Sequence, residues 1–228
     1  ILRDATGITL QEALGAEGFL LEEFPKAARN KKDVLAYFEA HIEQGPVLEA
    51  ENRAVGVVTA IAAQYRFRVR MKGVAGHAGT MPMSLRQDAL AAAAEAVLAI
   101  EKIGQSGPSD LVATVGQLTV VPGVPNVVPG EVVFSIDVRA GDAAVRNAAT
   151  AEIRTALEAL AARRKVTLEI SLQQDLPATP CNAALTDMLQ TFVPYRTAVE
   201  LCALEHGGTT TCDAGTNGIP SPATTRYV

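Results

Sequence analysis

The clearest pattern in the chain is an alternation of apolar and polar residues in three segments. In residues 65–72, aromatic, aliphatic and Met side chains alternate with Arg and Lys, and residues 131–139 and 166–173 alternate in the same way. Because successive side chains of a strand point to opposite faces, each segment predicts a strand with one dry and one wet face. An apolar segment at 111–120 predicts one more strand.

Two segments between these strands have a helical pattern. Ser84 and Gln87 stand at capping-box spacing before an Ala-rich run that Gly104 is expected to end. Asp142 is expected to cap a second helix, whose apolar stripe has helical spacing. The stripe consists of Val145, Ala149, Ile153, Leu157 and Leu160. The resulting order β-α-β-β-α-β predicts a ferredoxin-like α+β unit, in which two helices cover one face of an antiparallel sheet.

We expect this unit to be a domain of its own, residues 62–174. The flanking segments, 1–61 and 175–228, are expected to be pieces of an incomplete α/β domain. The chain opens Ile-Leu-Arg-Asp without an initiator Met, so residue 1 is interpreted as internal to a longer protein.

The first flanking segment contains signals of its own. Thr9 and Glu12 fit a capping box at the start of a short helix. Residues 37–43 alternate apolar side chains with Glu, His and Glu, which predicts a strand that ends at Gly45-Pro46. Residues 54–61 predict a second apolar strand.

Composition excludes several classes of protein. With 228 residues and 48% hydrophobic content, the chain can bury a core and is not expected to be disordered. The formal charge of -5, without a basic cluster interleaved with aromatics, argues against nucleic acid. No apolar run reaches the length of a membrane span. Three cysteines without paired spacing favour a cytoplasmic location over a disulfide framework.

Three histidines are present, and two stand in suggestive surroundings. His41 lies between Glu39 and Glu43 on one face of a predicted strand, which suits a metal ligand oriented by a carboxylate. A solvated edge strand with an incidental His is the alternative, since one His cannot make a metal site. His77 lies in a loop with glycines at 73, 76 and 79, where it could donate a hydrogen bond to an oxyanion or be an ordinary surface residue.

Two further residues could bind a substrate. Arg139 ends a predicted strand, and Asn126 lies in the proline-containing loop before that strand, so a hairpin would bring the two close together. Arg suits a carboxylate and Asn can serve a carbonyl and an amine. The alternative for Arg139 is a surface pair with Asp137, which would contribute little to stability.

Taken together, four segments resemble the hydantoinase/carbamoylase branch of the aminoacylase and metallo-carboxypeptidase superfamily. That branch includes allantoate amidohydrolase, N-carbamoyl-L-amino-acid hydrolase and β-ureidopropionase. The segments are Glu39-Ala-His-Ile-Glu-Gln-Gly-Pro-Val-Leu-Glu49, Gly76-His-Ala-Gly-Thr-Met-Pro-Met83 with Arg86-Gln-Asp-Ala-Leu90, Asn126-Val-Val-Pro-Gly130 and Phe134-Ser-Ile-Asp-Val-Arg139. The resemblance covers roughly residues 5 to 185.

The resemblance implies a role for each candidate. His41 matches a ligand of one of two bridged divalent metal ions, zinc or manganese, and Gln44 matches a residue that lines the substrate pocket. His77 matches the catalytic lid histidine that polarises the scissile carbonyl. Asn126 and Arg139 match residues that hold the substrate, with Arg139 on its carboxylate. The implied substrate is a linear ureido or N-carbamoyl compound, allantoate first and N-carbamoyl-L-amino acids next, and the implied partner is a second copy bound through the lid sheet.

The chain also departs from the family pattern. The upstream metal ligands and the glutamate base of the family have no counterpart here, and Cys212 stands where a late family motif has a metal-binding His. A thiolate can bind zinc, so Cys212 is a candidate ligand. We therefore expect the chain by itself not to hydrolyse substrate. The competing hypothesis is a non-catalytic module with the lid fold, for dimerisation or for binding a small ligand.

Overall fold

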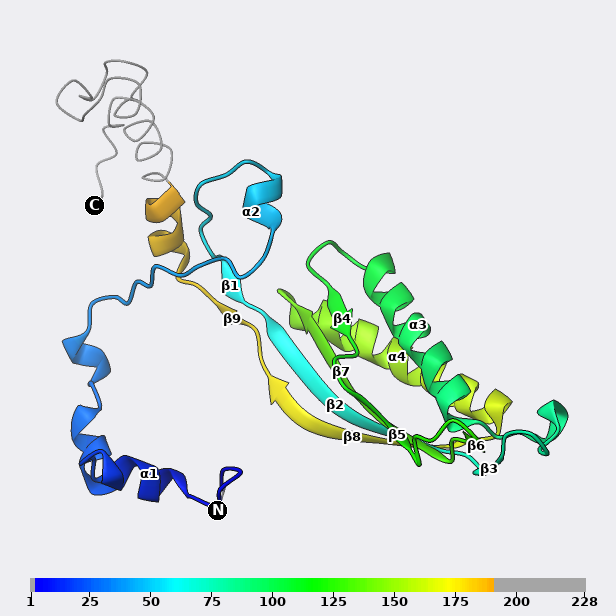
Figure 1. The fold of residues 1–228 in the computed structure, drawn as a ribbon. Helices are drawn as coiled ribbons and strands as arrows, with labels where there is room; N and C mark the ends of the chain where they lie inside the picture. Colours follow the sequence, from blue (N-terminus) through cyan, green and yellow to red (C-terminus); the bar gives the residue numbers. More distant parts are fainter. Residues whose placement is uncertain (1–2, 191–228) are drawn as a thin grey trace, which may run out of the picture. The chain divides into compact units, whose positions relative to one another are not determined.

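The computed structural model describes residues 3–190 (Figure 1). The chain forms two compact units, one ending at Asn52 and the other beginning at Arg53. The first unit contains only short helices: α1 (Leu10–Ala16), the 3-10 helices η1 (Leu21–Ala27) and η2 (Lys31–Asp33), and α2 (Val47–Ala50).

The capping box predicted at the start of α1 is confirmed. The Glu12 backbone N–H donates to Thr9 Oγ1 at 3.2 Å, and the Thr9 N–H donates to a Glu12 carboxylate oxygen at 2.7 Å. Two of the backbone N–H groups that a helix start leaves unpaired are thereby satisfied.

The strand predicted at 37–43 is wrong, because these residues have no regular structure. A strand needs a neighbour for its backbone hydrogen bonds, and no described residue pairs with this segment. Its apolar side chains are exposed as well: Tyr37 is 77% exposed, Phe38 53% and Ile42 75%. Alternation of apolar and polar residues is compatible with a strand, but the strand forms only where a neighbouring strand accepts and donates its backbone hydrogen bonds.

The second unit is built on a five-stranded antiparallel sheet. Its strands are β2 (Ala63–Lys72), β4 (Val112–Thr114), β5 (Leu118–Val121), β7 (Glu131–Ala140) and β8 (Thr167–Leu176). β2 lies between β7 and β8, and β4 and β5 both pair with the other side of β7. The α+β fold is confirmed, with the predicted strand at 111–120 divided in two.

Two pairs of short strands adjoin the sheet. β1 (Ala60–Ile61) pairs with β9 (Thr179–Pro180), so the strand predicted at 54–61 is reduced to its last two residues. β3 (Gly76–His77) pairs with β6 (Val127–Val128). The second pair joins two loops that lie 50 residues apart in the sequence.

Two helices, α3 (Ala89–Ser106) and α4 (Ala143–Arg164), cover one face of the sheet (Figure 1). Asp142 caps α4 as predicted, accepting from the Ala144 N–H at 2.7 Å. No helix in the described range is long and apolar enough to span a membrane.

The predicted limits of α3 are wrong at both ends. Ser84 lies in a short 3-10 helix, η3 (Met83–Leu85), and the cap is Asp88, which accepts from the Leu90 and Ala91 N–H groups at 2.9 and 3.0 Å. Gly104 lies inside the helix. A Cβ there would stand 3.3 Å from Ala113, so this glycine lets α3 approach β4 closely.

The core lies between the helices and the sheet. The predicted dry face of β7 is confirmed: Val132, Phe134, Ile136 and Val138 are at most 1% exposed. Four alanines of α3 face them and are fully buried: Ala89, Ala92, Ala93 and Ala96. Such small side chains allow the helix to lie close to the sheet, which compensates for the low aromatic content of the chain.

A buried arginine joins α4 to the start of β2 and the end of β8. Arg146 Nη1 donates to the backbone oxygens of Leu176 at 2.7 Å and Gln64 at 3.3 Å, and to Asp175 Oδ1 at 3.0 Å. Its guanidinium also lies 3.6 Å from the centre of the Tyr65 ring. This contact was not evident in the sequence, where Arg146 follows Val145 of the apolar stripe.

On the face of the sheet without helices, one carboxylate accepts hydrogen bonds from three side chains. Asp137 accepts from Arg139 Nε and Nη2 at 2.8 and 2.9 Å, from Arg66 Nε at 2.9 Å, and from Gln64 Nε2 at 2.8 Å. Burial by itself would raise the pKa of Asp137, but the hydrogen bonds outweigh burial and lower the pKa to about 2.

We predict that Leu157→Ala destabilises the domain by about 3 kcal/mol, because Leu157 is fully buried against the sheet and its loss leaves a cavity. The measurement is urea unfolding followed by circular dichroism. Glu158→Ala, at the next and exposed position of α4, is the control and is expected to stay within about 0.5 kcal/mol of the wild type. Equal losses in both variants would contradict the assignment of Leu157 to the core.

A second prediction concerns how the stability of the domain depends on pH. Because the pKa of Asp137 is lowered in the folded state, its stabilising effect is complete above the unfolded pKa and is lost as the pH falls toward about 2. Asp137→Asn should therefore lower the free energy of unfolding by roughly 2 kcal/mol at neutral pH, and by about half as much near pH 3. A difference that stays constant over this pH range would contradict the ion-pair account.

Candidate functional site

The loops that carry His77 and Asn126 lie side by side. His77 pairs with Val127 in the β3–β6 ladder, and the Ala78 N–H donates to the Asn126 backbone oxygen at 2.9 Å. Both His77 and Asn126 are exposed. The structure therefore brings together two of the residues that the sequence had singled out.

A local hydrogen bond determines which nitrogen of His77 can donate. The Gly79 N–H donates to His77 Nδ1 at 3.1 Å, so Nδ1 is the acceptor. In a neutral imidazole the proton then lies on Nε2, which is left to donate to another group. This arrangement is what a hydrogen bond to a developing oxyanion requires.

Arg86 holds the His77 loop in place. Its Nε donates to the Met81 backbone oxygen at 3.0 Å, and its Nη2 donates to the Ala78 backbone oxygen at 2.7 Å. The Met81 N–H in turn donates to the His77 oxygen at 3.1 Å. Sequence reasoning gave Arg86 no role, although an arginine just after a glycine-rich loop was a usable signal.

Arg139 lies far from these loops, and the expectation that a hairpin brings it near Asn126 is wrong. Arg139 is paired with Gln64 at the start of β2, whereas Glu131 is paired with Lys72 at the end of β2, where the His77 loop begins. The eight steps along the strand from Glu131 to Arg139 span about 26 Å. The whole of β7 thus separates Arg139 from His77 and Asn126 in one chain.

Arg139 is also already paired. Its Nε and Nη2 groups hold Asp137 in a two-point ion pair, the arrangement considered as the alternative reading of the sequence. The hydrogen bond to Asp137 raises the pKa of Arg139, which stays charged.

His41 and Gln44 belong to the first unit and are both exposed. The nearby carboxylate of Glu43 accepts from the backbone N–H groups of Val47 and Leu48 at the start of α2, at 2.9 and 3.1 Å. Glu43 therefore caps a helix and does not orient His41. Gln44 has a φ of 55°, a left-handed conformation that is uncommon for a residue other than glycine.

The described residues do not form a metal site. Within residues 3–190, no group of three or more His, Cys, Asp or Glu side chains could hold a metal ion. His41 alone cannot hold a pair of ions. Cys212, the other proposed ligand, lies outside the described residues.

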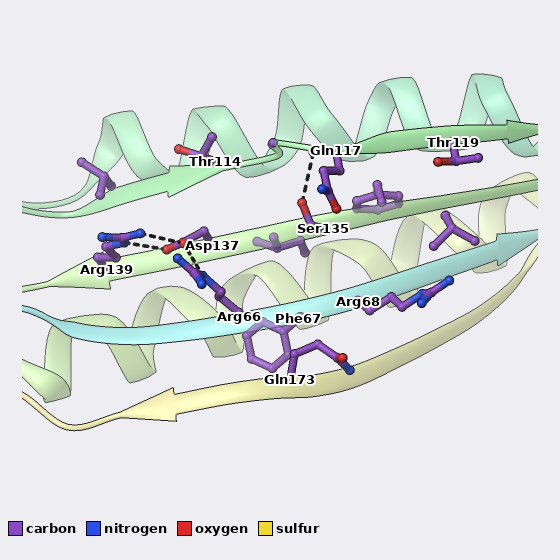
Figure 2. Close-up of a pocket in the computed structure, with 15 residues that line it drawn as sticks. Arg66, Phe67, Arg68, Thr114, Gln117, Thr119, Ser135, Asp137, Arg139 and Gln173 are labelled. Atoms are coloured by element: carbon purple, nitrogen blue, oxygen red, sulfur yellow. Dashed lines mark hydrogen bonds and ion pairs between the residues drawn. The ribbon is translucent and has the colours of Figure 1, made fainter. Parts of the chain in front are cut away.

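An open groove of about 790 Å³ runs along the face of the sheet that the helices leave free (Figure 2). Three arginines, Arg66, Arg68 and Arg139, line it together with one carboxylate, Asp137. Hydroxyl and amide side chains make up most of the remaining polar lining: Thr114, Gln117, Thr119, Ser135 and Gln173. The groove thus has two excess positive charges, although the chain as a whole is acidic.

Residues 63–165 match the family model of the peptidase dimerisation domain. This segment falls within the domain predicted at 62–174 and contains the main sheet except β8, together with both long helices.

Named relatives extend the similarity beyond that domain. The chain is 42% identical to an N-carbamoyl-L-amino acid amidohydrolase of Geobacillus stearothermophilus over 79% of this chain and 44% of the relative. It is 36% identical to allantoate deiminase 1 of Glycine max over 74% of this chain and 39% of the relative. Among solved structures, a hydantoinase/carbamoylase family amidase from Burkholderia ambifaria matches with a TM-score of 0.70, 39% identity and coverage of 82% and 44%.

The chain spans less than half the length of each of these three proteins. The similarity nevertheless covers 74–82% of this chain, more than the matched domain alone, and all three names belong to hydrolases of related carbon–nitrogen bonds. Residues 63–165 are thus identified as a peptidase dimerisation domain, and the chain as similar to part of the hydantoinase/carbamoylase family amidases.

Proposed function

We propose that the chain is the lid part, with a flanking strip of the catalytic part, of a metal-dependent amidohydrolase that acts on linear ureido or N-carbamoyl compounds. The names of the relatives support this substrate class, with N-carbamoyl-L-amino acids and allantoate as the two candidates. The observation that carries the proposal is the His77 loop, which is held by Arg86 and leaves the Nε2 proton free.

His77 would donate its Nε2 proton in a hydrogen bond to the carbonyl oxygen of the ureido group. This hydrogen bond strengthens as negative charge develops on that oxygen, which lowers the barrier to attack on the carbon. Asn126, on the neighbouring loop, would bind the amide part of the same group.

Arg139 would bind the carboxylate of the substrate. Its Nε and Nη2 are engaged with Asp137, which leaves Nη1 to donate and holds the guanidinium in one orientation. Asp137 therefore positions Arg139, and a substrate carboxylate does not have to displace Asp137.

The distance between these groups implies two chains. A small ureido acid cannot span the roughly 26 Å from Arg139 to the end of the sheet near His77. A twofold pair of lid domains can place the His77 and Asn126 of one chain beside the Arg139 of the other. Dimerisation would then be part of substrate binding and not only of assembly.

The metal ions of the proposed reaction, zinc or manganese, need ligands beyond those that the described residues supply. His41 would be one ligand in the longer assembly, and Gln44 would line the substrate pocket. Since residues 3–190 contain no metal cluster, a non-catalytic dimerisation or small-ligand-binding module with the same fold is the second candidate.

We predict that the lid is catalytically competent when it is joined to a complete metal site. In a chimera, residues 62–174 of this chain replace the corresponding segment of the Geobacillus stearothermophilus relative, and hydrolysis of N-carbamoyl-L-amino acids is measured. His77→Ala should lower kcat by about 10²- to 10³-fold with little change in KM, because the lost hydrogen bond acts mainly in the transition state.

Arg154→Ala, an exposed position on α4, is the matched control and should leave kcat and KM unchanged. Arg139→Gln should mainly raise KM. Circular dichroism and gel filtration establish that each chimera is folded. A folded chimera that turns over substrate equally well with and without His77 would count against the proposed role and favour the non-catalytic module.

A further prediction is that the 228-residue chain forms a homodimer. Light scattering after gel filtration should give about twice the 23.9 kDa mass of one chain, because the matched domain is a dimerisation domain. A monomer at micromolar concentration would remove the basis for a substrate site shared between two lids.

A further inference from the structure

One arginine of the groove lacks the acidic partner that its neighbours have. β2 presents four basic side chains on its open face. Arg66 pairs with Asp137 at 2.9 Å, Arg70 with Glu131 at 3.2 Å, and Lys72 with Glu169 at 3.5 Å. Arg68, the remaining one, has no ion pair or side-chain hydrogen bond to any residue in the part of the chain that the structure describes.

The neighbours of Arg68 across the sheet are uncharged. Arg68 lies opposite Ser135 on β7 and Ser171 on β8, so it has a hydroxyl on either side in place of a carboxylate. Figure 2 shows its guanidinium extending along the groove, away from the cluster formed by Asp137, Arg66 and Arg139. An exposed cation with serines on both sides is open to a ligand from solution.

The hydroxyl group of Ser135, opposite Arg68, can still donate a hydrogen bond. Ser135 Oγ accepts from the Gln117 N–H at 3.1 Å, which occupies one of its lone pairs. Its hydroxyl proton remains available to donate into the groove. The interruption between β4 and β5 brings Gln117 to this position, so the same bend that divides the predicted strand also orients Ser135.

Electrostatics favours an anion at this place. Arg66 and Arg70 stand two residues to either side of Arg68 on the same face of the strand, about 7 Å away along the backbone. Arg70 is paired with Glu131, and Arg66 is paired with Asp137, which it shares with Arg139. Arg68 has no acidic partner among the described residues and contributes a full positive charge. A carboxylate or phosphate group would balance this charge and accept from the planar guanidinium at two points.

We propose that Arg68 and Ser135 form an oxyanion subsite in the groove, for the carboxylate or phosphate group of a small anionic molecule. The groove volume of about 790 Å³ lies in the range of small-molecule sites, so a ligand larger than the anion itself fits. Ser135 and Arg139 stand four positions apart on β7, about 13 Å, so the subsite is distinct from the proposed carboxylate contact of Arg139. It does not depend on the proposed reaction.

The test is a titration of the isotope-labelled 228-residue chain with inorganic phosphate and, separately, with succinate, followed by NMR at constant ionic strength. Saturable shifts are expected at the Arg68 side chain and at the backbone amides around Ser135. Arg68→Gln should weaken the binding at least about tenfold, and Ser135→Ala should weaken it by a smaller factor, because a charged hydrogen bond contributes more than a neutral one.

Arg70→Gln is the matched control, since it removes the same charge from the next position of the same face but from a paired arginine. It should change the binding by no more than about twofold. If Arg68→Gln disturbs the spectrum of the fold, Arg68→Lys keeps the charge without the planar fork and should bind more weakly than the wild type. Tighter binding of phosphate or of succinate would identify the ligand as a phosphate or a carboxylate compound, and either result supports the subsite.

Three results would overturn the proposal. Absence of saturable shifts with both anions would show that the groove holds no oxyanion. Equal weakening by Arg70→Gln and Arg68→Gln would reduce the effect to the general positive field of the sheet. Loss of binding in Arg139→Gln but not in Arg68→Gln would place the anion at Arg139, which would leave the proposed function intact and remove the second subsite.

Discussion

The antiparallel register of β2 with β7 is the constraint on which the rest of the domain depends. It places Arg66 opposite Asp137, Arg68 opposite Ser135 and Val69 opposite Phe134. Because side chains alternate between faces, a shift of one residue would turn the arginines into the core and expose the apolar row. Burial of the apolar row beneath two helices therefore also determines which charged groups meet on the open face. The groove is a consequence of the way the core is packed.

The same register explains why one face can be both stable and open to ligands. Asp137 gathers Arg66, Arg139 and Gln64 at one end, and Glu131 and Glu169 neutralise Arg70 and Lys72 at the other. Exposed pairs of this kind contribute little stability individually, but together they hold the long side chains in fixed orientations. Between the two clusters lies Arg68, which is flanked by paired arginines but has no ion pair of its own among the described residues. Packing of the opposite face, with its alanine-rich helix, supports the sheet from behind.

Much of the domain could be predicted because its signals were local and repeated. Alternation in residues 65–72 and 131–139 located β2 and β7, and the periodic stripe with its Asp142 cap located α4. The failures depended on partners distant in sequence. Residues 37–43 alternate like a strand but no described residue pairs with them, and Ser84 matched a capping box although Asp88 caps the helix.

The separation of Asn126 from Arg139 was missed because proximity in sequence was taken for proximity in space. The ten-residue strand β7 lies extended along the sheet and carries Arg139 away from the loop of Asn126. Arg86 was missed because its partners are backbone oxygens, which leave no trace in a residue pattern. Arg146 was missed because its partners, two backbone oxygens, Asp175 and the Tyr65 ring, are distant in sequence.

Arg139 and Arg68, which a ligand could meet in the groove, differ in whether they already have an acidic partner. With a pKa of about 2, Asp137 stays ionised over the whole range in which the protein is expected to work, so its pair with Arg139 persists there. An anion that binds Arg139 must use the single Nη1 edge and share the guanidinium with a carboxylate that is already present. An anion that binds Arg68 meets the full fork and a hydroxyl donor without competition. The two positions therefore differ in kind, since Arg139 is held rigidly to orient a ligand and Arg68 is free to attract one.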